Sequence, residues 1–312
     1  MFIVYSCRQT YIPPSTFTTM LENSIRKWNP WWANINELDD LIGEKRDILE
    51  NIENSFSLRH IKDIIGVRRA GKTTTLYQLI DILIKNKTNP KNLVFLNFDD
   101  PDIQLSTFDD LIKAIDKINP DTTHLFLDEI QQKKNWEPWL RKLYDINKFN
   151  QIFISGSSAS LLTQDVGRVL SGRHVTFKIF PFSFKEYLKF TGWKDFSNDY
   201  LEYDKNKLLH YLNLYIKGGG FPEVINKNEY QRKIILTNLY NDIIARDISS
   251  RYNTSFDIAH KICYHLMSNN SKEFSYRSVA NGTNLSVETV EKYLEYLKDR
   301  WEKYYWWVVL GW

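Results

Sequence analysis

The sequence has few cysteines and no long apolar run, and both absences exclude whole classes of protein. Only Cys7 and Cys263 occur among its 312 residues, and their separation matches no metal-binding or redox motif. Such a low cysteine content suits a reducing compartment, so we predict a cytoplasmic protein. No apolar run approaches the roughly 20 residues that a membrane span needs. The apolar segment Met1–Cys7 lacks a basic flank and a cleavage site, which argues against a signal peptide.

The sequence also lacks a large excess of either positive or negative charge. The 41 basic and 38 acidic residues leave a net charge of +3, so no global basic field indicates a nucleic-acid partner. Apolar residues make up 43% of the chain and charged residues 25%, which is ordinary for a globular protein. The length is sufficient for two domains.

The most informative segment is Gly66–Thr73, which matches the phosphate-loop pattern G-x-x-x-x-G-K-[ST]. The glycines let the backbone curl so that its amides converge on a phosphate. Lys72 would bring a charge to the β- and γ-oxygens of ATP, and the Thr73 hydroxyl would bind Mg²⁺. A predicted strand precedes the loop and an amphipathic helix follows it, so a glycine turn that binds nothing is the weaker alternative. The predicted nucleotide-binding residues here are Gly66, Val67, Arg68, Arg69, Ala70, Gly71, Lys72, Thr73 and Thr74.

A second motif is the apolar run at residues 124–127 that ends in Asp128 and Glu129. A buried strand ending in two acids, at this distance after a phosphate loop, is typical of the Walker B motif. Asp128 is predicted to hold Mg²⁺, and Glu129 to orient and deprotonate the attacking water. The alternative is a strand that ends in a solvated acidic turn.

Two further catalytic candidates follow. Ser157 lies after a predicted strand at 151–154 and would sense the γ-phosphate or position the water, with Ser155 as second choice; simple helix capping is the equal alternative. Arg173 precedes a predicted strand at 174–180. If the chain forms a homo-oligomer, Arg173 would act as an arginine finger on a neighbouring subunit; otherwise it is a surface arginine.

The chain before the phosphate loop contains a tryptophan-rich segment, Trp28–Trp32. We interpret it as an apolar strap on the core in preference to a docking site for a partner. Residues 1–19 are expected to have little structure. Leu38–Phe56 is predicted to be one helix with Lys45 and Arg46 on its polar face. The acidic run at 99–102 is interpreted as a solvated turn in preference to a metal site.

The second half of the chain is predominantly helical in pattern. Helices are predicted at 183–190, 205–217 and 229–250, and the segment Gly218–Pro222 interrupts them as either a lid over the base or a hinge. Residues 257–269 are predicted to form a helix, and residues 276–300 have the pattern of a helix-turn-helix. Its last helix carries Glu288, Glu291 and Glu295 beside three basic residues, so DNA binding and a structural or protein-binding role remain equal alternatives.

In this order the motifs resemble those of the mainly archaeal AAA+ ATPases related to the STAND signalling NTPases. The resemblance covers residues 20–305 and implies an α/β P-loop NTPase core of the ASCE type, with five parallel strands, a helical lid and a winged helix. It implies ATP and Mg²⁺ as ligands, with ATP preferred to GTP. It also suggests that Pro222, in Gly220-Phe221-Pro222, contacts adenine. The lid lacks a convincing second sensor arginine.

We therefore divide the chain into a leading segment (1–57), an ATPase core (58–182), a lid (183–252) and a winged-helix domain (253–312). The predicted function is Mg²⁺-dependent ATP hydrolysis, with the nucleotide state coupled to the winged-helix domain. One alternative is a nucleotide-switched regulator that binds DNA or a protein and turns over slowly. Another is a truncated remnant that only binds ATP, because relatives usually continue past the winged helix while this chain stops in the apolar run Tyr304–Trp312. No membrane partner is expected.

Overall fold

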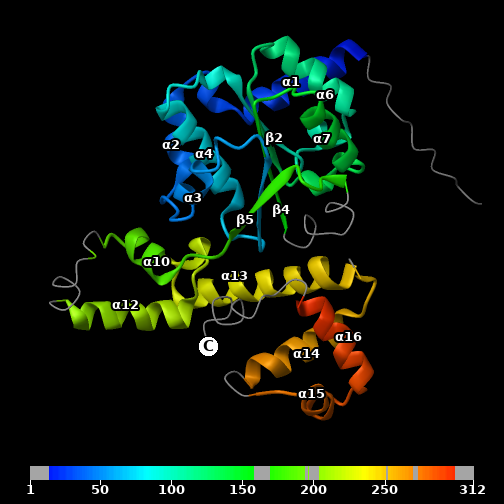
Figure 1. The fold of residues 1–312 in the computed structure, drawn as a ribbon. Coiled ribbons are helices and arrows are strands. Elements are labelled where there is room, and N and C mark those ends of the chain that lie inside the picture. The colour runs from blue at the N-terminus through cyan, green and yellow to red at the C-terminus, as the bar shows by residue number, and fades with distance from the viewer. Residues whose placement is uncertain are drawn as a thin grey trace, which may run out of the picture.

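The computed structural model describes residues 14–157, 169–193, 196, 204–250, 252–269 and 273–298. An α/β part occupies the top of Figure 1, and a helical part lies below it. The strands are β1 (Ile61–Gly66), β2 (Leu93–Asn97), β3 (His124–Asp128), β4 (Gln151–Ser157) and β5 (His174–Ile179). The helices of the α/β part are α1 (Pro14–Lys27), α2 (Asp39–Ile42), α3 (Leu49–Glu53), α4 (Lys72–Lys85), α5 (Pro101–Leu105), α6 (Phe108–Ile118) and α7 (Trp136–Asp145). Those of the helical part are α10 (Phe184–Phe190), α12 (Lys205–Gly218), α13 (Glu229–Asp242), the π-helix η6 (Ile243–Ser250), α14 (Phe256–Ser268), α15 (Tyr276–Thr283) and α16 (Val287–Lys298).

The five strands form one parallel sheet in the order β2-β3-β4-β1-β5. The predicted P-loop NTPase fold with five parallel strands is therefore confirmed. Alternate residues along β1–β4 enter two apolar cores, one beneath α1, α6 and α7 and the other beneath α2, α3 and α4, and β5 adds Phe177 and Ile179 to the second core. Only β4 separates β1 from β3, so the carboxyl ends of β1 and β3 meet at one edge of the sheet, where ligands bind in open α/β folds.

The tryptophan-rich segment closes the free edge of the sheet, as predicted for a strap. Asn29 is buried against the edge strand β2; its amide nitrogen donates to the Phe95 carbonyl at 2.8 Å, and its amide oxygen accepts from the Phe95 N–H at 2.7 Å. The Trp32 indole donates to the carbonyl of Leu93. A side-chain amide thus takes the place of a neighbouring strand on an edge that would otherwise be free to pair.

Two expectations for the leading segment are wrong. Of residues 1–19, the first 13 lie outside the described residues, and 14–19 belong to α1, which begins at Pro14, a residue suited to the first helical turn. Residues 38–56 do not form one helix, because α2 ends at Ile42, is followed by Gly43 with a φ of 52°, and α3 begins only at Leu49. The intervening loop carries Arg46, which is buried and not on a polar helix face.

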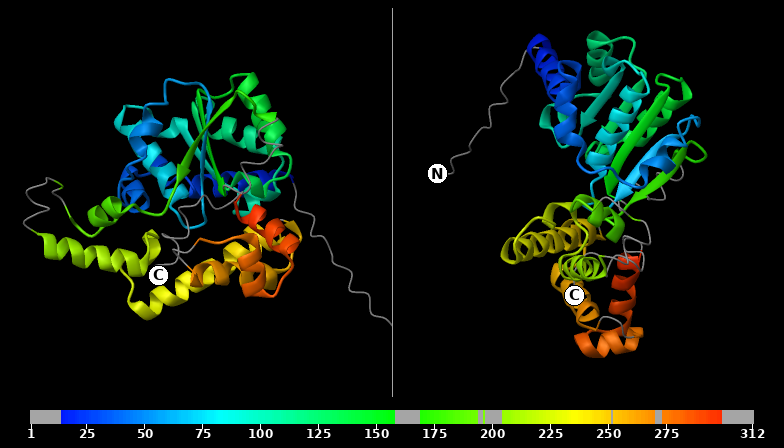
Figure 2. Two further views of the ribbon diagram at one scale, coloured as in Figure 1. Left: turned by 60° about the horizontal axis from the view of Figure 1, so that its bottom comes forward. Right: turned by 90° about the vertical axis from the view of Figure 1, so that its left-hand side faces the viewer.

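The helical part follows β5 directly and lies at the carboxyl edge of the sheet in the views of Figure 2. One apolar core joins the short turn η5 (Pro222–Val224) with α13, η6 and α14–α16. The predicted helix 229–250 is α-helical to Asp242 and then a π-helix. The wing of the predicted winged helix, including the apolar run Tyr304–Trp312, falls outside the described residues, and the domain boundaries remain predictions. Within the described segments no helix is long and apolar enough to cross a membrane.

Candidate functional site

The phosphate loop connects β1 to α4 at the carboxyl edge of the sheet. Gly66 needs to be glycine because a Cβ there would lie 2.2 Å from the carbonyl oxygen of Ile179 on β5. Gly71 has a φ of 97° and lies directly before the first residue of α4, so a side chain there would strain the loop. Arg69 also adopts a left-handed conformation, with a φ of 64°. The loop amides and the amino terminus of α4 together suit an anion.

The remaining loop residues lie as follows. The side chains of Arg68, Arg69 and Thr74 line the cleft beside the loop. Val67 is half-buried, and its carbonyl accepts from the Ala70 N–H at 3.2 Å, so this amide is engaged within the loop. Ala70 itself is fully buried.

Lys72 connects the phosphate loop to the end of β3. Its side chain is 5% exposed, and its ammonium lies 3.6 Å from Glu129 Oε1 and donates to the Val67 carbonyl at 3.3 Å. The ammonium of Lys72 is thus paired with a carboxylate, which carries negative charge as a phosphate does. The phosphate-binding role of Lys72 stays a prediction.

Asp128 lies at the end of β3 and faces the phosphate loop. Its carboxylate accepts from the Thr73 hydroxyl at 2.8 Å and from the Ser155 hydroxyl. Burial raises the pKa of Asp128 to about 6, and the Glu129 charge adds to this rise while the two hydroxyls oppose it. The two predicted Mg²⁺ ligands, Thr73 and Asp128, are thus in direct contact.

Glu129 follows Asp128 in a left-handed conformation with a φ of 52°. Its backbone N–H donates to the Ser155 hydroxyl at 3.2 Å, and its carboxylate accepts from the amide of Gln131. The left-handed turn ends the strand and directs the carboxylate toward Lys72. Both acids of the predicted pair therefore face the phosphate loop.

The tip of β4 distinguishes the two serine candidates. Ser155, the second choice from the sequence, contacts both Asp128 and Glu129 through its hydroxyl. The backbone of Ser157 pairs with Gly66, which places this residue beside the phosphate loop, while its side chain is outside the described set. The role predicted for Ser157 remains a prediction.

Arg173 lies immediately before β5, at the amino-terminal end of that strand, whereas the phosphate loop lies at the carboxyl ends of the strands. Its guanidinium donates to Asp145 at 2.9 Å and to the carbonyl of Ser171. It is therefore remote from the phosphate loop of its own chain. Only a neighbouring subunit's site could use it as an arginine finger.

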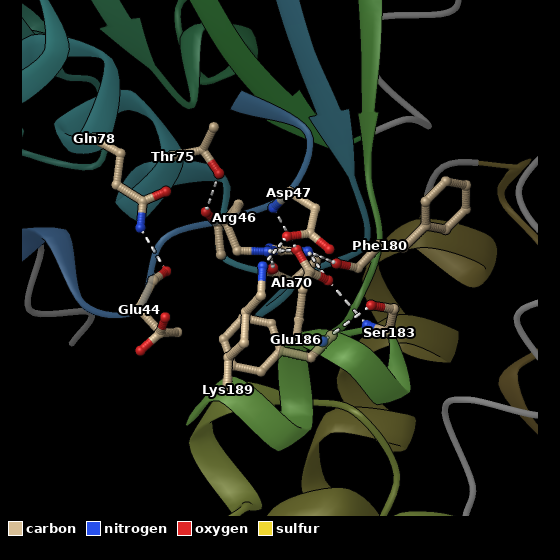
Figure 3. A network of polar contacts seen from close by, with 12 residues as sticks. Glu44, Arg46, Asp47, Ala70, Thr75, Gln78, Phe180, Ser183, Glu186 and Lys189 are labelled. Atoms are coloured by element: carbon tan, nitrogen blue, oxygen red, sulfur yellow. Dashed lines mark hydrogen bonds and ion pairs between the residues drawn. The ribbon is translucent and has the colours of Figure 1, made fainter. Parts of the chain in front are cut away.

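Arg46 was missed as a site residue by the sequence pattern, yet it joins three segments behind the phosphate loop (Figure 3). Its guanidinium donates to the Ala70 carbonyl at 2.9 Å, to the Phe180 carbonyl at 2.6 Å and to the carboxylate of Glu186 at 2.8 Å. Glu186 also accepts from the Asp47 N–H at 3.0 Å. The buried Arg46–Glu186 pair therefore fastens the first helix of the lid, α10, to the phosphate loop.

These residues surround a cleft of about 760 Å³ between the sheet edge and the lid. That volume lies in the usual range for ligand sites, roughly 300–1,000 Å³. Pro222 lines the cleft on the lid side together with Glu223, and Leu41 and Phe182 add apolar surface. The lining includes four cationic side chains and five carboxylates, namely Arg46, Arg68, Arg69 and Lys72, and Glu44, Asp99, Asp128, Glu129 and Glu223.

Residues 58–188 match the family model described as an AAA domain, and the parallel sheet and phosphate-loop geometry agree with that assignment. This part of the chain thus has the fold of a P-loop NTPase and is similar in sequence to AAA domains. Residues 209–301 match a second model, described as a domain of unknown function (DUF8612).

Among curated relatives, the chain is 36% identical over 277 residues to the uncharacterized protein MJ1544 of Methanocaldococcus jannaschii, covering 84% of this chain and 60% of that one. An uncharacterized protein of Haemophilus influenzae is 30% identical over 250 residues, covering 77% of this chain and 60% of the relative. The chain thus spans about 60% of the length of these relatives.

Solved structures give a weaker likeness. A RuvB mutant of Thermotoga maritima covers 82% of this chain and 87% of its own, with 13% identity and a TM-score of 0.41. The Aeropyrum pernix Orc1 protein in complex with DNA covers 80% of this chain and 81% of its own, with 10% identity and a TM-score of 0.35.

Proposed function

We propose that the chain binds ATP with Mg²⁺ in this cleft and hydrolyses the bond to the γ-phosphate. The observation that carries the proposal is the convergence of Lys72, Thr73, Asp128 and Glu129, from two strand ends, on one cleft. A lysine, a hydroxyl and two carboxylates at the mouth of a glycine-rich loop suit a nucleoside triphosphate and its metal ion.

The donors at Thr73 and Asp128 fit Mg²⁺. This ion prefers oxygen ligands, and the hydroxyl and carboxylate oxygens lie 2.8 Å apart. The carboxylate of Asp128 accepts hydrogen bonds from the hydroxyls of Thr73 and Ser155, and its burial raises its pKa. With five carboxylates against four cations, the cleft also needs added positive charge before it can accept a polyphosphate. Mg²⁺ would supply that charge and polarise the phosphoryl oxygens.

The residues of the chain would act as follows. Lys72 would exchange Glu129 for the β- and γ-phosphate oxygens, because the phosphates carry more charge than one carboxylate. Glu129, released from Lys72, would orient the attacking water and accept its proton. Ser155 would hold Asp128 and Glu129 at their present spacing through its hydroxyl.

Three finer assignments belong to the same proposal. Pro222 would pack against the adenine from the lid side, since it lines the cleft opposite the loop. Ser157 would approach the γ-phosphate from the tip of β4, because its backbone pairs with Gly66. Arg173 would complete the site of a neighbouring subunit in a homo-oligomer, after leaving Asp145.

For the output of the site we favour a protein partner of the C-terminal helices over DNA. On the part of α16 whose exposure is described, Glu288, Glu291 and Glu295 are exposed beside Lys292. These exposed carboxylates on the last helix repel a phosphate backbone. Filter binding to duplex DNA at low and high salt tests this choice; tight binding that weakens steeply with salt would refute it.

Nucleotide binding by a Lys72→Ala variant tests the site. We expect ATP affinity to fall at least tenfold, while Lys85→Ala, at the far end of the same helix, should bind like the wild type because Lys85 is paired with Asp81 at the surface. Equal ATP affinity in the Lys72→Ala variant and the wild type would refute the proposed site.

A further inference from the structure

An ion pair joins the phosphate loop to the lid across the cleft. Arg69 Nη1 lies 3.3 Å from Glu223 Oε2, and both side chains line the cleft. The two side chains are 58% and 38% exposed, so water competes with the pair. Contacts of this kind are weak and exchange easily, unlike the buried Arg46–Glu186 pair.

The turn that carries Glu223 contacts the cleft on one side and an apolar core on the other. Pro222 and Glu223 line the cleft, whereas Phe221 and Val224 are 0% and 1% exposed within the core shared by α13–α16. Since the turn η5 is only three residues long, a backbone shift at Glu223 would carry its buried neighbours with it.

The base of this turn is tightly packed. A Cβ on Gly220 would lie 2.3 Å from the Phe182 carbonyl oxygen, and the Phe182 N–H donates to the Gly220 carbonyl at 2.7 Å. From the other side, Val67 of the phosphate loop packs against the core of the C-terminal helices. The phosphate loop, η5 and the C-terminal helices are therefore in continuous contact.

We propose that Glu223 competes with the phosphates of the bound nucleotide for Arg69, and thereby links the charge in the cleft to the position of the C-terminal helices. The inference rests on the proposed nucleotide site. A guanidinium binds phosphate oxygens in bidentate fashion, so the polyphosphate takes Arg69 from the single carboxylate. Glu223 then stands unpaired beside an anion and is repelled, and the repulsion is greater for a triphosphate than for a diphosphate. Glu223 is thus a residue that determines how strongly the site prefers ATP to ADP.

A double-mutant cycle in the full chain tests the competition. The variants Glu223→Gln, Arg69→Gln and their combination are titrated with Mg²⁺ and either ADP or a non-hydrolysable ATP analogue. We expect Glu223→Gln to raise affinity for the ATP analogue by roughly two- to fivefold, the size of an exposed ion pair, and affinity for ADP by less. In the Arg69→Gln background the same change should have a much smaller effect.

Glu44→Gln serves as a matched control, because Glu44 is a second carboxylate of the cleft lining and is not paired with Arg69. Equal gains in affinity from Glu44→Gln and Glu223→Gln, or an unchanged effect in the Arg69→Gln background, would overturn the competition. No change in affinity in the Glu223→Gln variant would overturn it as well.

Hydrogen exchange tests the link to the C-terminal helices. In the wild type, the ATP analogue should change amide protection in residues 221–224 and in α14, and Glu223→Gln should show part of that change without nucleotide. Protection that is identical in all four combinations of variant and nucleotide would overturn the link. Failure of the wild type to bind nucleotide would instead refute the proposed function itself.

Discussion

Replacing the buried carboxylate of Asp128 with an amide should make the empty protein more stable than the wild type and should remove most of the stabilisation that bound nucleotide provides. Asp128→Asn keeps the shape of the side chain. Its oxygen can still accept from Ser155, and its new N–H group can donate to the Thr73 hydroxyl. The variant removes only the charge that burial disfavours.

The size and pH dependence follow from the pKa of Asp128. Folding raises it from 3.8 to about 6, so the wild type loses stability as pH rises through this interval. The full loss is about 3 kcal/mol above pH 7 and roughly half of that at pH 5. The variant avoids this loss. Its Tm should exceed that of the wild type by roughly 5–10 °C at pH 7.5, and the difference should shrink toward pH 4.

Thermal unfolding with and without Mg²⁺ and a non-hydrolysable ATP analogue provides the assay. At 100 times its Kd, a ligand stabilises the protein that binds it by about 2.7 kcal/mol, so saturating nucleotide should stabilise the wild type and leave the variant nearly unchanged. Asp121→Asn is the control, because Asp121 is exposed and its charge costs little. A variant that is less stable than the wild type at pH 7.5 without ligand would refute the reasoning.

Three other substitutions test the scaffold of the site, each by Tm and chemical unfolding. Asn29→Ala should cost about 2–4 kcal/mol, because it leaves the buried N–H and carbonyl of Phe95 unpaired. Asn36→Ala, at an exposed site, should change stability by less than about 0.5 kcal/mol. Equal effects of the two substitutions would contradict the role of Asn29 at the sheet edge. Glu186→Gln should cost about 3 kcal/mol at neutral pH, because Arg46 loses its buried partner. Burial raises the pKa of Glu186, but Arg46 lowers it by more, so the net pKa lies below the ordinary value of 4.5. The stability that the ionised Glu186 contributes is therefore lost as pH falls below 4.5, and the difference in stability between variant and wild type should disappear there. A difference that is constant with pH would exclude the ion pair as its cause. Gly66→Ala should cost about 1–3 kcal/mol, since its methyl group would meet the Ile179 carbonyl at 2.2 Å; unchanged stability would show that β5 shifts freely.

Most of the sheet and the phosphate side of the site were predictable because their signals are local. The strands β2 and β3 contain short apolar runs bounded by polar residues, and the loop Gly66–Thr73 carries its motif in consecutive residues. The pair Asp128 and Glu129 follows from the same reasoning, because parallel strands end at one edge of the sheet. These predictions needed no knowledge of contacts between distant segments.

The features that the sequence did not predict depend on such contacts. Arg46 and Glu186 are 140 positions apart, and nothing near either residue indicates the other. The break after α2 places Arg46 in a loop, whereas apolar periodicity alone favoured one continuous helix across Gly43. At the tip of β4, the alternation of side chains along the strand decides that Ser155 faces Asp128, and the motif alone could not fix that register.

The most direct test of the account is ATP turnover and ATP affinity measured together in Glu129→Gln. If Glu129 orients and deprotonates the attacking water, the variant should bind Mg²⁺ and ATP at least as tightly as the wild type, because Lys72 no longer has a competing carboxylate, and it should hydrolyse ATP roughly 10²–10⁴ times more slowly. Glu137→Gln, in the first turn of α7, should retain wild-type turnover. Turnover at the wild-type rate in Glu129→Gln would contradict the proposed mechanism at its central step.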